Sequence, residues 1–186
     1  MSATHYLSHI TTGPITDDAI VETFLAEEAS IKLWSPVALV AAGSGEYIAR
    51  AGPTANAADP KVIGVVVGPL KDAENLLACT AAGQAIQVCT RGPCKVRVDG
   101  TDAIDIGDAL VSYAGDYYAK LMVADPDFPT GGDTTYYTAT IEAAMETNSV
   151  LMIAQMQAGF AIALYAGTVD GDIIPCFVTG AKGTPT

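Results

Sequence analysis

The side chains that could carry acid–base or metal chemistry are few and lie far apart in the sequence. The chain has only two histidines, His5 and His9, and their spacing would suit two ligands of one zinc ion. Cys89 and Cys94 would have to complete that site, but their spacing is loose and they lie far along the chain. Without a histidine in the body of the chain, a Ser–His–acid or Cys–His site lacks its base. No phosphate-binding glycine motif occurs either, so the sequence predicts no enzyme, no cofactor and no metal site.

Four cysteines make up the thiol content, and we interpret them as small buried hydrophobic residues on strands. Two of them, Cys89 and Cys94, flank the sequence Arg91-Gly92-Pro93, which is typical of a turn, and would then face each other across it. A disulfide would form there only if the protein leaves the reducing cytosol. The full set is Cys79, Cys89, Cys94 and Cys176.

Two pairs of carboxylates stand close enough in the sequence to act together. Asp105 and Asp108 flank Ile106-Gly107, and Asp170 and Asp172 flank Gly171. Acidic residues beside glycine are ordinary turn formers, because their side chains accept bonds from nearby backbone N–H groups. We therefore favour a role in turns over a catalytic pair.

The elements that must position these side chains are predicted to be β-strands. Apolar residues alternate with polar ones over residues 86–88, 96–98 and 104–106, a period of two that indicates half-buried strands. Turn formers separate these runs at Gly92-Pro93, Asp99-Gly100 and Gly107-Asp108. The sequence predicts a meander of the kind found in small barrels and sandwiches.

One hairpin unit recurs in the chain. Residues 38–50 and residues 109–120 both run from an apolar strand through a glycine-containing turn to a Gly–acid–Tyr–x–Ala–base sequence. Residues 163–174 form a weaker third copy. We interpret the repeat as a hairpin used more than once inside a single β domain.

Further strands are predicted at residues 20–25, 62–67, 160–164 and 173–178. The run at 62–67 is apolar throughout, so burial on both faces is expected. Pro175 lacks an N–H group, which predicts an edge position for the last strand. Trp34, the only tryptophan, is expected in the core.

We expect a mainly β protein with one small barrel or β-tulip-like sandwich domain over residues 20–178. Residues 1–19 form an expected flexible N-terminal arm and residues 179–186 an expected flexible tail. The arm is polar with isolated apolar residues, so it is either a disordered terminus or a segment that orders on a partner surface. In the second case its anchors are Tyr6, Leu7 and Ile10.

The charge balance and the apolar runs restrict the partners. Nine basic and 21 acidic residues give a net charge of −12, which repels phosphate backbones and predicts no nucleic-acid binding. The apolar runs are too short to span a membrane, and residues 1–10 do not resemble a secretory signal. We therefore expect synthesis in the cytoplasm and no membrane partner.

The order of these elements resembles the small capsid-decoration proteins of tailed viruses, also called head-stabilising or cement proteins, which have β-tulip or barrel-like domains. The resemblance extends over about residues 20–120 and consists of turns and strands, with no catalytic signature. It rests on Thr23-Phe24 with Ala29-Ser30-Ile31 and Pro36-Val37-Ala38-Leu39, on Gly45–Ala49 leading to Val62-Ile63-Gly64-Val65, on Ala85-Ile86-Gln87-Val88 with Gly92, Val96 and Val98, and on Ile104-Asp105-Ile106-Gly107-Asp108-Ala109-Leu110.

This resemblance implies a function by binding. Such proteins sit on the outer surface of a viral capsid, often as homotrimers, and bridge neighbouring subunits of the major capsid protein to stabilise the shell. It implies location on the virion and the major capsid protein as partner. An arm such as residues 1–19 would add affinity by pairing with a strand edge of the partner.

Two other functions fit the same sequence. One is a self-assembling structural subunit of a tail tube, filament or surface array. The other is a ligand-binding or enzymatic domain of β-clip type that uses Asp105, Asp108, Tyr117 and Tyr118.

Overall fold

The computed structural model describes residues 18–41, 50–52, 61–113, 118–122 and 158–180. Nearly all regular structure in these segments is β-strand, so the prediction of a mainly β protein is confirmed. The strands are β1 (Ile20–Ala26), β2 (Pro36–Val40), β3 (Arg50–Gly52), β4 (Val62–Gly68), β5 (Ala85–Arg97), β6 (Ala109–Ser112), β7 (Ala119–Leu121), β8 (Ala161–Ala163) and β9 (Ile173–Val178).

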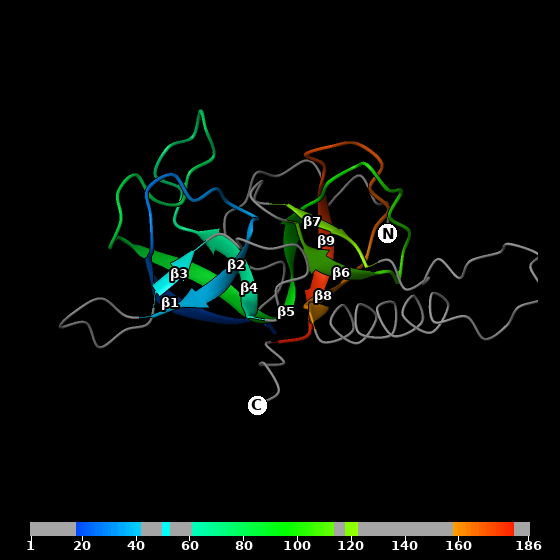
Figure 1. Ribbon diagram of the computed structural model, residues 1–186, viewed down its shortest axis with the longest axis horizontal. Helices are drawn as coiled ribbons and strands as arrows, with labels where there is room; N and C mark the ends of the chain where they lie inside the picture. Colours follow the sequence, from blue (N-terminus) through cyan, green and yellow to red (C-terminus); the bar gives the residue numbers. More distant parts are fainter. Residues whose placement is uncertain (1–17, 42–49, 53–60, 114–117, 123–157, 181–186) are drawn as a thin grey trace, which may run out of the picture.

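The first five strands form a closed small barrel. Their order is β1-β3-β2-β4-β5, and β5 pairs back with β1 to close the ring. All pairings are antiparallel except β1–β3, which is parallel. This first barrel occupies the left half of Figure 1. Its strand β4 is buried along its whole length, as its apolar sequence predicted.

The second half of the structure continues from the same strand. Its sheet has the order β5-β9-β8-β6-β7 and lies to the right in Figure 1. Val98, directly after β5, forms a parallel bridge with Ala119 in β7, and the Asp99 N–H donates to the Ala119 carbonyl at 2.8 Å. The sheet therefore curls back on its first strand, and we call it the second barrel.

β5 belongs to both barrels because its 13 residues change partners halfway along. Up to Arg91 it pairs with β1 and β4, and from Gly92 onward it pairs with β9. Gly92 lies at this change with a φ of 103°, a conformation that side chains other than glycine rarely adopt. A Cβ atom there would lie 2.8 Å from the Ala19 Cα atom, so the segment before β1 packs directly against the seam.

Trp34 links β4 and β5 from the interior of the protein. It is 2% exposed, which confirms its predicted place in the core. Its backbone N–H donates to the Val66 carbonyl at 2.7 Å, and its backbone carbonyl accepts from the backbone N–H of Arg97 at 2.8 Å. The tryptophan backbone thus extends the hydrogen bonding of both strands, although Trp34 itself has a positive φ of 62°.

The repeated hairpin is present at all three predicted places. β2 pairs with β3, β6 with β7, and β8 with β9, each pair antiparallel. The strand predictions for residues 20–25, 62–67 and 173–178 are confirmed. The run at 160–164 contains β8 as a shorter strand.

The predicted turn at Gly92-Pro93 is wrong, because β5 runs through it without interruption. The glycine supplies the positive φ of a bend, and the strand continues on new partners. Cys94 consequently does not face Cys89 across a turn. Its Cα partner is Cys176 of β9.

The strand expected over residues 104–106 is also absent. Ile104 forms an isolated bridge with Gly167, whereas Ile106 is 70% exposed in a turn. The alternation of Ile104, Asp105 and Ile106 therefore arises from one buried anchor beside a surface turn.

Pro175 does not place β9 at a sheet edge, because β9 lies between β5 and β8. The Pro175 carbonyl accepts from the Leu164 N–H at 2.9 Å, and β8 ends one residue earlier, at Ala163. The absent N–H of the proline thus falls where the neighbouring strand stops. An interior strand tolerates the proline at this point.

All four cysteines are free and buried, which confirms their interpretation as small core residues. The Cys94 and Cys176 Sγ atoms are 3.7 Å apart, and the contact with Cys176 holds the pKa of the Cys94 thiol well above its usual range. The hydrogen bond with Cys94, together with burial, likewise raises the pKa of Cys89. Both thiols stay protonated in the folded protein at neutral pH.

The other expectations about chain ends fall mostly outside the described residues. Residues 1–17 of the predicted arm and residues 181–186 of the predicted tail belong there, as do the proposed anchors Tyr6, Leu7 and Ile10. The arm and the tail therefore stay predictions.

Replacing Gly92 by alanine is expected to destabilise the protein more than the same change at Gly83. Both glycines have positive φ, which costs another residue about 1–2 kcal/mol. At Gly83 a Cβ meets nothing within 4 Å, whereas at Gly92 it meets the Ala19 backbone, and such overpacking costs about 1–3 kcal/mol more. Urea denaturation of the two variants measures the difference in unfolding free energy. Equal losses would show that β5 does not depend on the close approach of Ala19.

The buried thiols are expected to make stability fall at alkaline pH. Their pKa is raised in the folded state, so the folded protein holds these protons while the unfolded chain releases them above about pH 8.5. The free energy of unfolding should then drop by about 1.4 kcal/mol per pH unit for each such thiol. Urea denaturation with reductant from pH 7.5 to 9.5 tests this, with Cys94→Ala as a control of shallower slope. A free energy that does not change over this range would contradict the prediction.

Candidate binding surfaces

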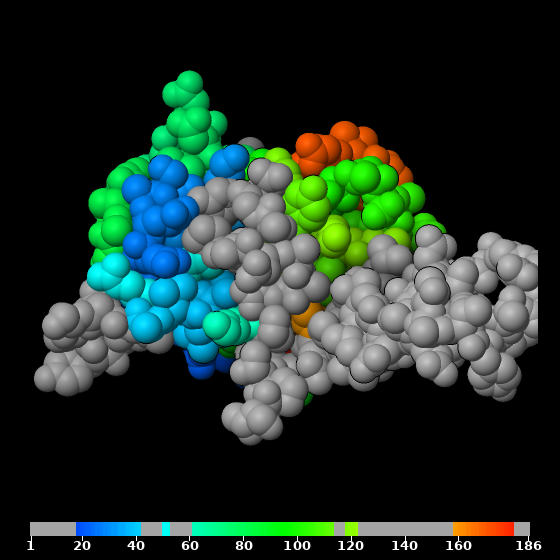
Figure 2. Space-filling model, in the orientation of Figure 1, coloured from blue at the N-terminus to red at the C-terminus, as the bar shows by residue number. Residues whose placement is uncertain are grey.

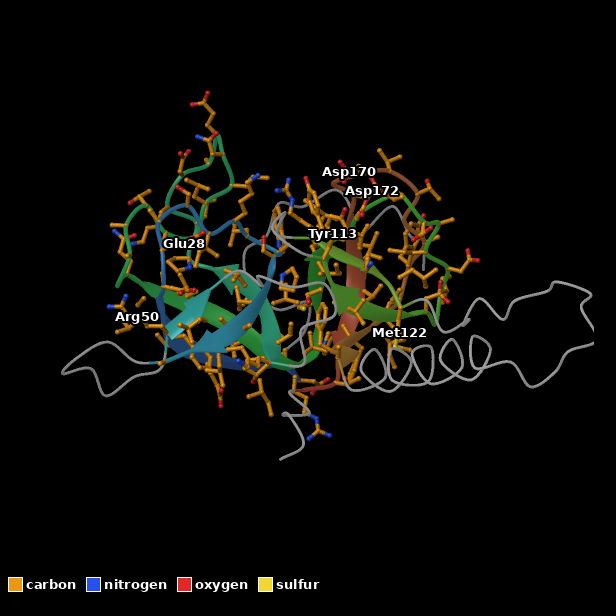
Figure 3. The ribbon with its side chains drawn as sticks, in the orientation of Figure 1. Glu28, Arg50, Tyr113, Met122, Asp170 and Asp172 are labelled. Atoms are coloured by element: carbon orange, nitrogen blue, oxygen red, sulfur yellow. The ribbon has the colours of Figure 1, made fainter. Side chains whose placement is uncertain are left out.

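A polar hollow of about 370 Å³ opens where three segments of the second barrel meet. Asp99 and Thr101 follow β5, Tyr113 and Tyr118 flank the connection between β6 and β7, and Asp170 lies between β8 and β9. Figure 3 shows Tyr113 and Asp170 close together at the top of the second barrel. We call these five residues the tyrosine–aspartate hollow.

Close backbone packing brings the first and third segments together. A Cβ atom on Gly100 would collide with the backbone of Val169 and Asp170, so glycine is required at this crossing. Figure 2 shows the green segment that follows β5 beside the orange segment that follows β8. The Asp170 carboxylate therefore reaches the hollow although it lies far from Asp99 in the sequence.

Asp99 is the most buried member of the hollow, with 8% of its surface exposed. Its Oδ1 atom accepts from the Thr101 N–H at 3.0 Å and from the Thr101 hydroxyl at 2.7 Å. These two bonds hold the carboxylate in one orientation. Its Oδ2 atom accepts no hydrogen bond from the part of the chain that the structure describes.

Two cations fix the tyrosine rings at the rim. The Arg97 guanidinium lies 5.7 Å from the centre of the Tyr118 ring, and the Lys120 ammonium lies 5.4 Å from that of Tyr113. Such cation–π contacts contribute about 0.5–1 kcal/mol each at exposed sites. Arg97 Nε is buried and has no hydrogen-bond partner within the described segments.

A second feature lies on the outer face of the same barrel. Phe177 in β9 and Ile162 in β8 are directly opposite each other and are 41% and 39% exposed. Pro93 of β5 stands opposite Phe177, and Ala109 of β6 stands opposite Ile162. Because side chains on opposed residues share a face, these four form a continuous stripe across four strands, which we call the outer apolar row.

The neighbours of the row confirm that it faces outward. In a strand, alternate side chains point to opposite faces. The residues beside the row are all buried in the barrel interior, and they are Cys94, Cys176, Val178, Ala161, Ala163 and Leu110. The row is therefore solvent-facing apolar surface on a rigid, hydrogen-bonded support.

Asp105 and Asp108 serve a turn, as predicted. Asp108 Oδ2 accepts from the Asp105 N–H at 2.7 Å, and neither residue lines the hollow. Asp172 has the same kind of role, accepting from the N–H groups of Thr168 and Val169. Of the alternative ligand set, only Tyr118 reaches the hollow, and Tyr117 lies outside the described residues.

Sequence reasoning missed most of the hollow. Asp99 was assigned to a turn, and Asp170 was interpreted only as a turn former. Arg97 was assigned only as a polar position in an alternating strand. The signal available was the pairing of an aspartate-glycine turn after one strand with a second aspartate-glycine turn before another. Nothing in the sequence indicated that the two turns meet.

Among the residues that the structure describes, no three His, Cys, Asp or Glu side chains come together in a way that could hold a metal ion. The zinc combination of His5 and His9 with cysteines lies partly outside those residues. No helix within the described ranges is both long and apolar enough to cross a membrane.

No protein-family model and no curated protein matches the chain. It is similar to the crystal structure of the N base of the head fiber gp8.5 in bacteriophage phi29, over 89% of this chain and 100% of that one, at 14% identity and a TM-score of 0.44. A score this low does not establish a common fold, so the assignment of the barrels depends on the strand pairings described above.

The role of Asp108 in its turn can be tested by substitution. Asp108→Ala removes the acceptor for the Asp105 N–H and should lower the free energy of unfolding by about 1 kcal/mol, whereas Asp108→Asn keeps an acceptor oxygen and should lose less. Asp102→Ala, at an exposed position nearby, controls for the removal of a negative charge. Chemical denaturation provides the comparison. If Asp108→Ala were as stable as the unmodified protein, the turn role would be wrong.

Proposed function

We propose that the protein is a capsid-decoration protein that binds the outside of a viral shell and bridges neighbouring major capsid subunits. It acts by binding and not by catalysis, and it binds as a homotrimer. The observation that carries the proposal is the outer apolar row, an apolar stripe on a rigid sheet in which Phe177 and Ile162 are exposed. The resemblance in sequence adds the identity of the partner.

The row has the properties of a protein-binding surface. Large aromatic side chains act as anchors at protein interfaces, and full burial of a Phe side chain contributes about 1.5–3 kcal/mol. Phe177 and Ile162 stand on strands that are hydrogen-bonded on both sides. Little conformational entropy is therefore lost when a partner covers them.

The arm begins next to this row. Ala19 packs against Gly92, and the next residue in β5 is Pro93, the first member of the row. A partner that covers the row would thus also meet the chain where it leads back to residues 1–17. We propose that Tyr6, Leu7 and Ile10 of the arm extend the same contact over the shell.

The charge and the repeated geometry of a shell support the same function. A net charge of −12 disfavours binding to packaged nucleic acid but is compatible with a place on the outside. Four side chains make a modest contact, and a decoration protein does not need a large one. When a trimer engages several capsid subunits at once, each bound subunit raises the effective concentration of the next contact, so the overall affinity exceeds that of one contact.

The sequence elements on which the resemblance rests lie mainly on strands of the first barrel and on β5. Thr23-Phe24 lies in β1, Pro36-Val37-Ala38-Leu39 in β2 and Val62-Ile63-Gly64-Val65 in β4. Ala85-Ile86-Gln87-Val88 begins β5, which also carries Gly92 and Val96. Most of these segments lie in the first barrel, which is joined through β5 to the sheet that carries the row.

Replacing Phe177 by glutamine should weaken binding to shells at least about tenfold, the equivalent of about 1.4 kcal/mol. The measurement is co-sedimentation of the full-length protein with shells of the virus that encodes it, at several protein concentrations. Leu39→Gln is the matched control, because Leu39 is similarly exposed but lies on the first barrel. Both variants should keep their melting temperature, since both side chains are on the outside.

If the Phe177 variant bound shells with unchanged occupancy, the role of the row would be wrong.

The oligomeric state distinguishes a capsid-decoration protein from a self-assembling structural subunit. Light scattering should give a trimer whose mass does not change with concentration. Open-ended growth with concentration would instead indicate a tail-tube, filament or array protein.

A further inference from the structure

We propose that the tyrosine–aspartate hollow is a binding site for a neutral sugar. This inference goes beyond the role on the shell and does not depend on it, because the hollow and the outer apolar row share no residue. The ligand set considered from the sequence contained Asp105, Asp108 and Tyr118. The proposed site contains Tyr118 but has Asp99 and Asp170 as its carboxylates.

The first argument is that two polar groups, one lining the hollow and one beside it, have unused hydrogen-bonding capacity. Asp99 is 8% exposed, and its Oδ1 atom accepts both bonds from Thr101, whereas Oδ2 accepts none within the described ranges. Arg97 Nε is buried and also has no partner there. A buried donor without a partner, such as Arg97 Nε, is rare in native proteins, because it costs about 1–3 kcal/mol.

The second argument is that hydroxyl groups match this set of donors and acceptors. A hydroxyl donates one hydrogen bond and accepts others, so one hydroxyl can donate to a carboxylate while a neighbour accepts from a tyrosine hydroxyl. The carboxylates of Asp99 and Asp170 supply acceptors, and the Tyr118 hydroxyl supplies a donor. A sugar carries adjacent hydroxyls that can satisfy both kinds of group at once.

The third argument concerns charge. Two carboxylates, Asp99 and Asp170, are balanced by two cations, Arg97 and Lys120, which lie against the tyrosine rings. A free phosphate would meet the two carboxylates that line the hollow, and a metal cation would lie near the two basic groups beside the tyrosine rings. Local neutrality therefore favours an uncharged polyhydroxyl ligand over either ion.

The aromatic rings and the size of the hollow complete the match. Tyr113 and Tyr118 are each held by a cation, so their rings offer rigid apolar surface beside the polar groups. The volume of about 370 Å³ falls within the range of about 300–1,000 Å³ that is typical of small-molecule sites. A Cβ atom on Gly171 would lie 3.8 Å from the Tyr118 hydroxyl, so this glycine borders the hydroxyl without crowding it.

The test is a titration of the full-length protein with glucose, galactose, mannose, N-acetylglucosamine, maltose and lactose, followed by isothermal calorimetry and by NMR shifts. Calcium chloride and inorganic phosphate are the comparison ligands. At least one sugar should bind saturably, with a Kd on the order of 1 mM or below, equivalent to about −4 kcal/mol.

Matched variants locate the binding. Asp170→Asn should weaken it at least about tenfold, and Tyr118→Ala should abolish it. Asp102→Asn removes the same charge outside the hollow and should leave the affinity unchanged. Asp170 is exposed, and its side chain makes no hydrogen bond to the described residues, so its variant should keep its melting temperature.

Three results would overturn the proposal. They are the absence of saturable binding by every sugar, tighter binding of calcium or phosphate than of any sugar, and sugar binding that Asp170→Asn does not weaken. None of these results bears on shell binding by the outer apolar row, so the two proposals can fail independently.

Discussion

The structure depends on one strand that must serve two barrels. A strand of 13 residues cannot follow the curvature of one closed barrel and also form the wall of another without a change of direction. Gly92 supplies that change through its positive φ, and Ala19 packs against it so closely that no side chain would fit. The pairing of β5 with β1 and β4 on one side of Gly92, and with β9 on the other, follows from this single bend.

The sequence predicted the strands and hairpins better than the contacts between distant parts of the chain. Period-two alternation identified parts of β5, and short runs of apolar residues identified β4 and further strands. The repeated Gly–acid–Tyr motif identified two hairpins, because strands and hairpins are set by nearby residues. Gly92-Pro93 misled us, since the same dipeptide suits a turn or a bend and only the tertiary partners decide. Pro175 misled us for a related reason, as its cost depends on where β8 ends, which its own sequence does not specify.

The tyrosine–aspartate hollow shows why sites are harder to predict than strands. Asp99 and Asp170 each occupy an ordinary aspartate-glycine turn, and each turn taken alone has a structural explanation. They form one hollow because Gly100 lets the backbone of Val169 and Asp170 approach, and because Asp99 is bonded to β7 through Ala119. These contacts join residues far apart in the chain, so no local pattern contains them. The outer apolar row was equally hidden, because its four members come from four strands.

The second half of β5 separates the two binding features along one rigid element. Pro93, in the outer apolar row, and Asp99, in the hollow, are six residues apart, which corresponds to about 20 Å in an extended strand. A partner centred on the row therefore leaves room for a small ligand in the hollow, and the segment leading to the arm packs at the row end of the strand. The bend at Gly92 thus sets both where the arm starts and how the second barrel is turned relative to the first. Because Pro93 lies in β5 and Asp99 follows two residues after its end, the backbone of this segment sets the distance between these two members of the row and the hollow.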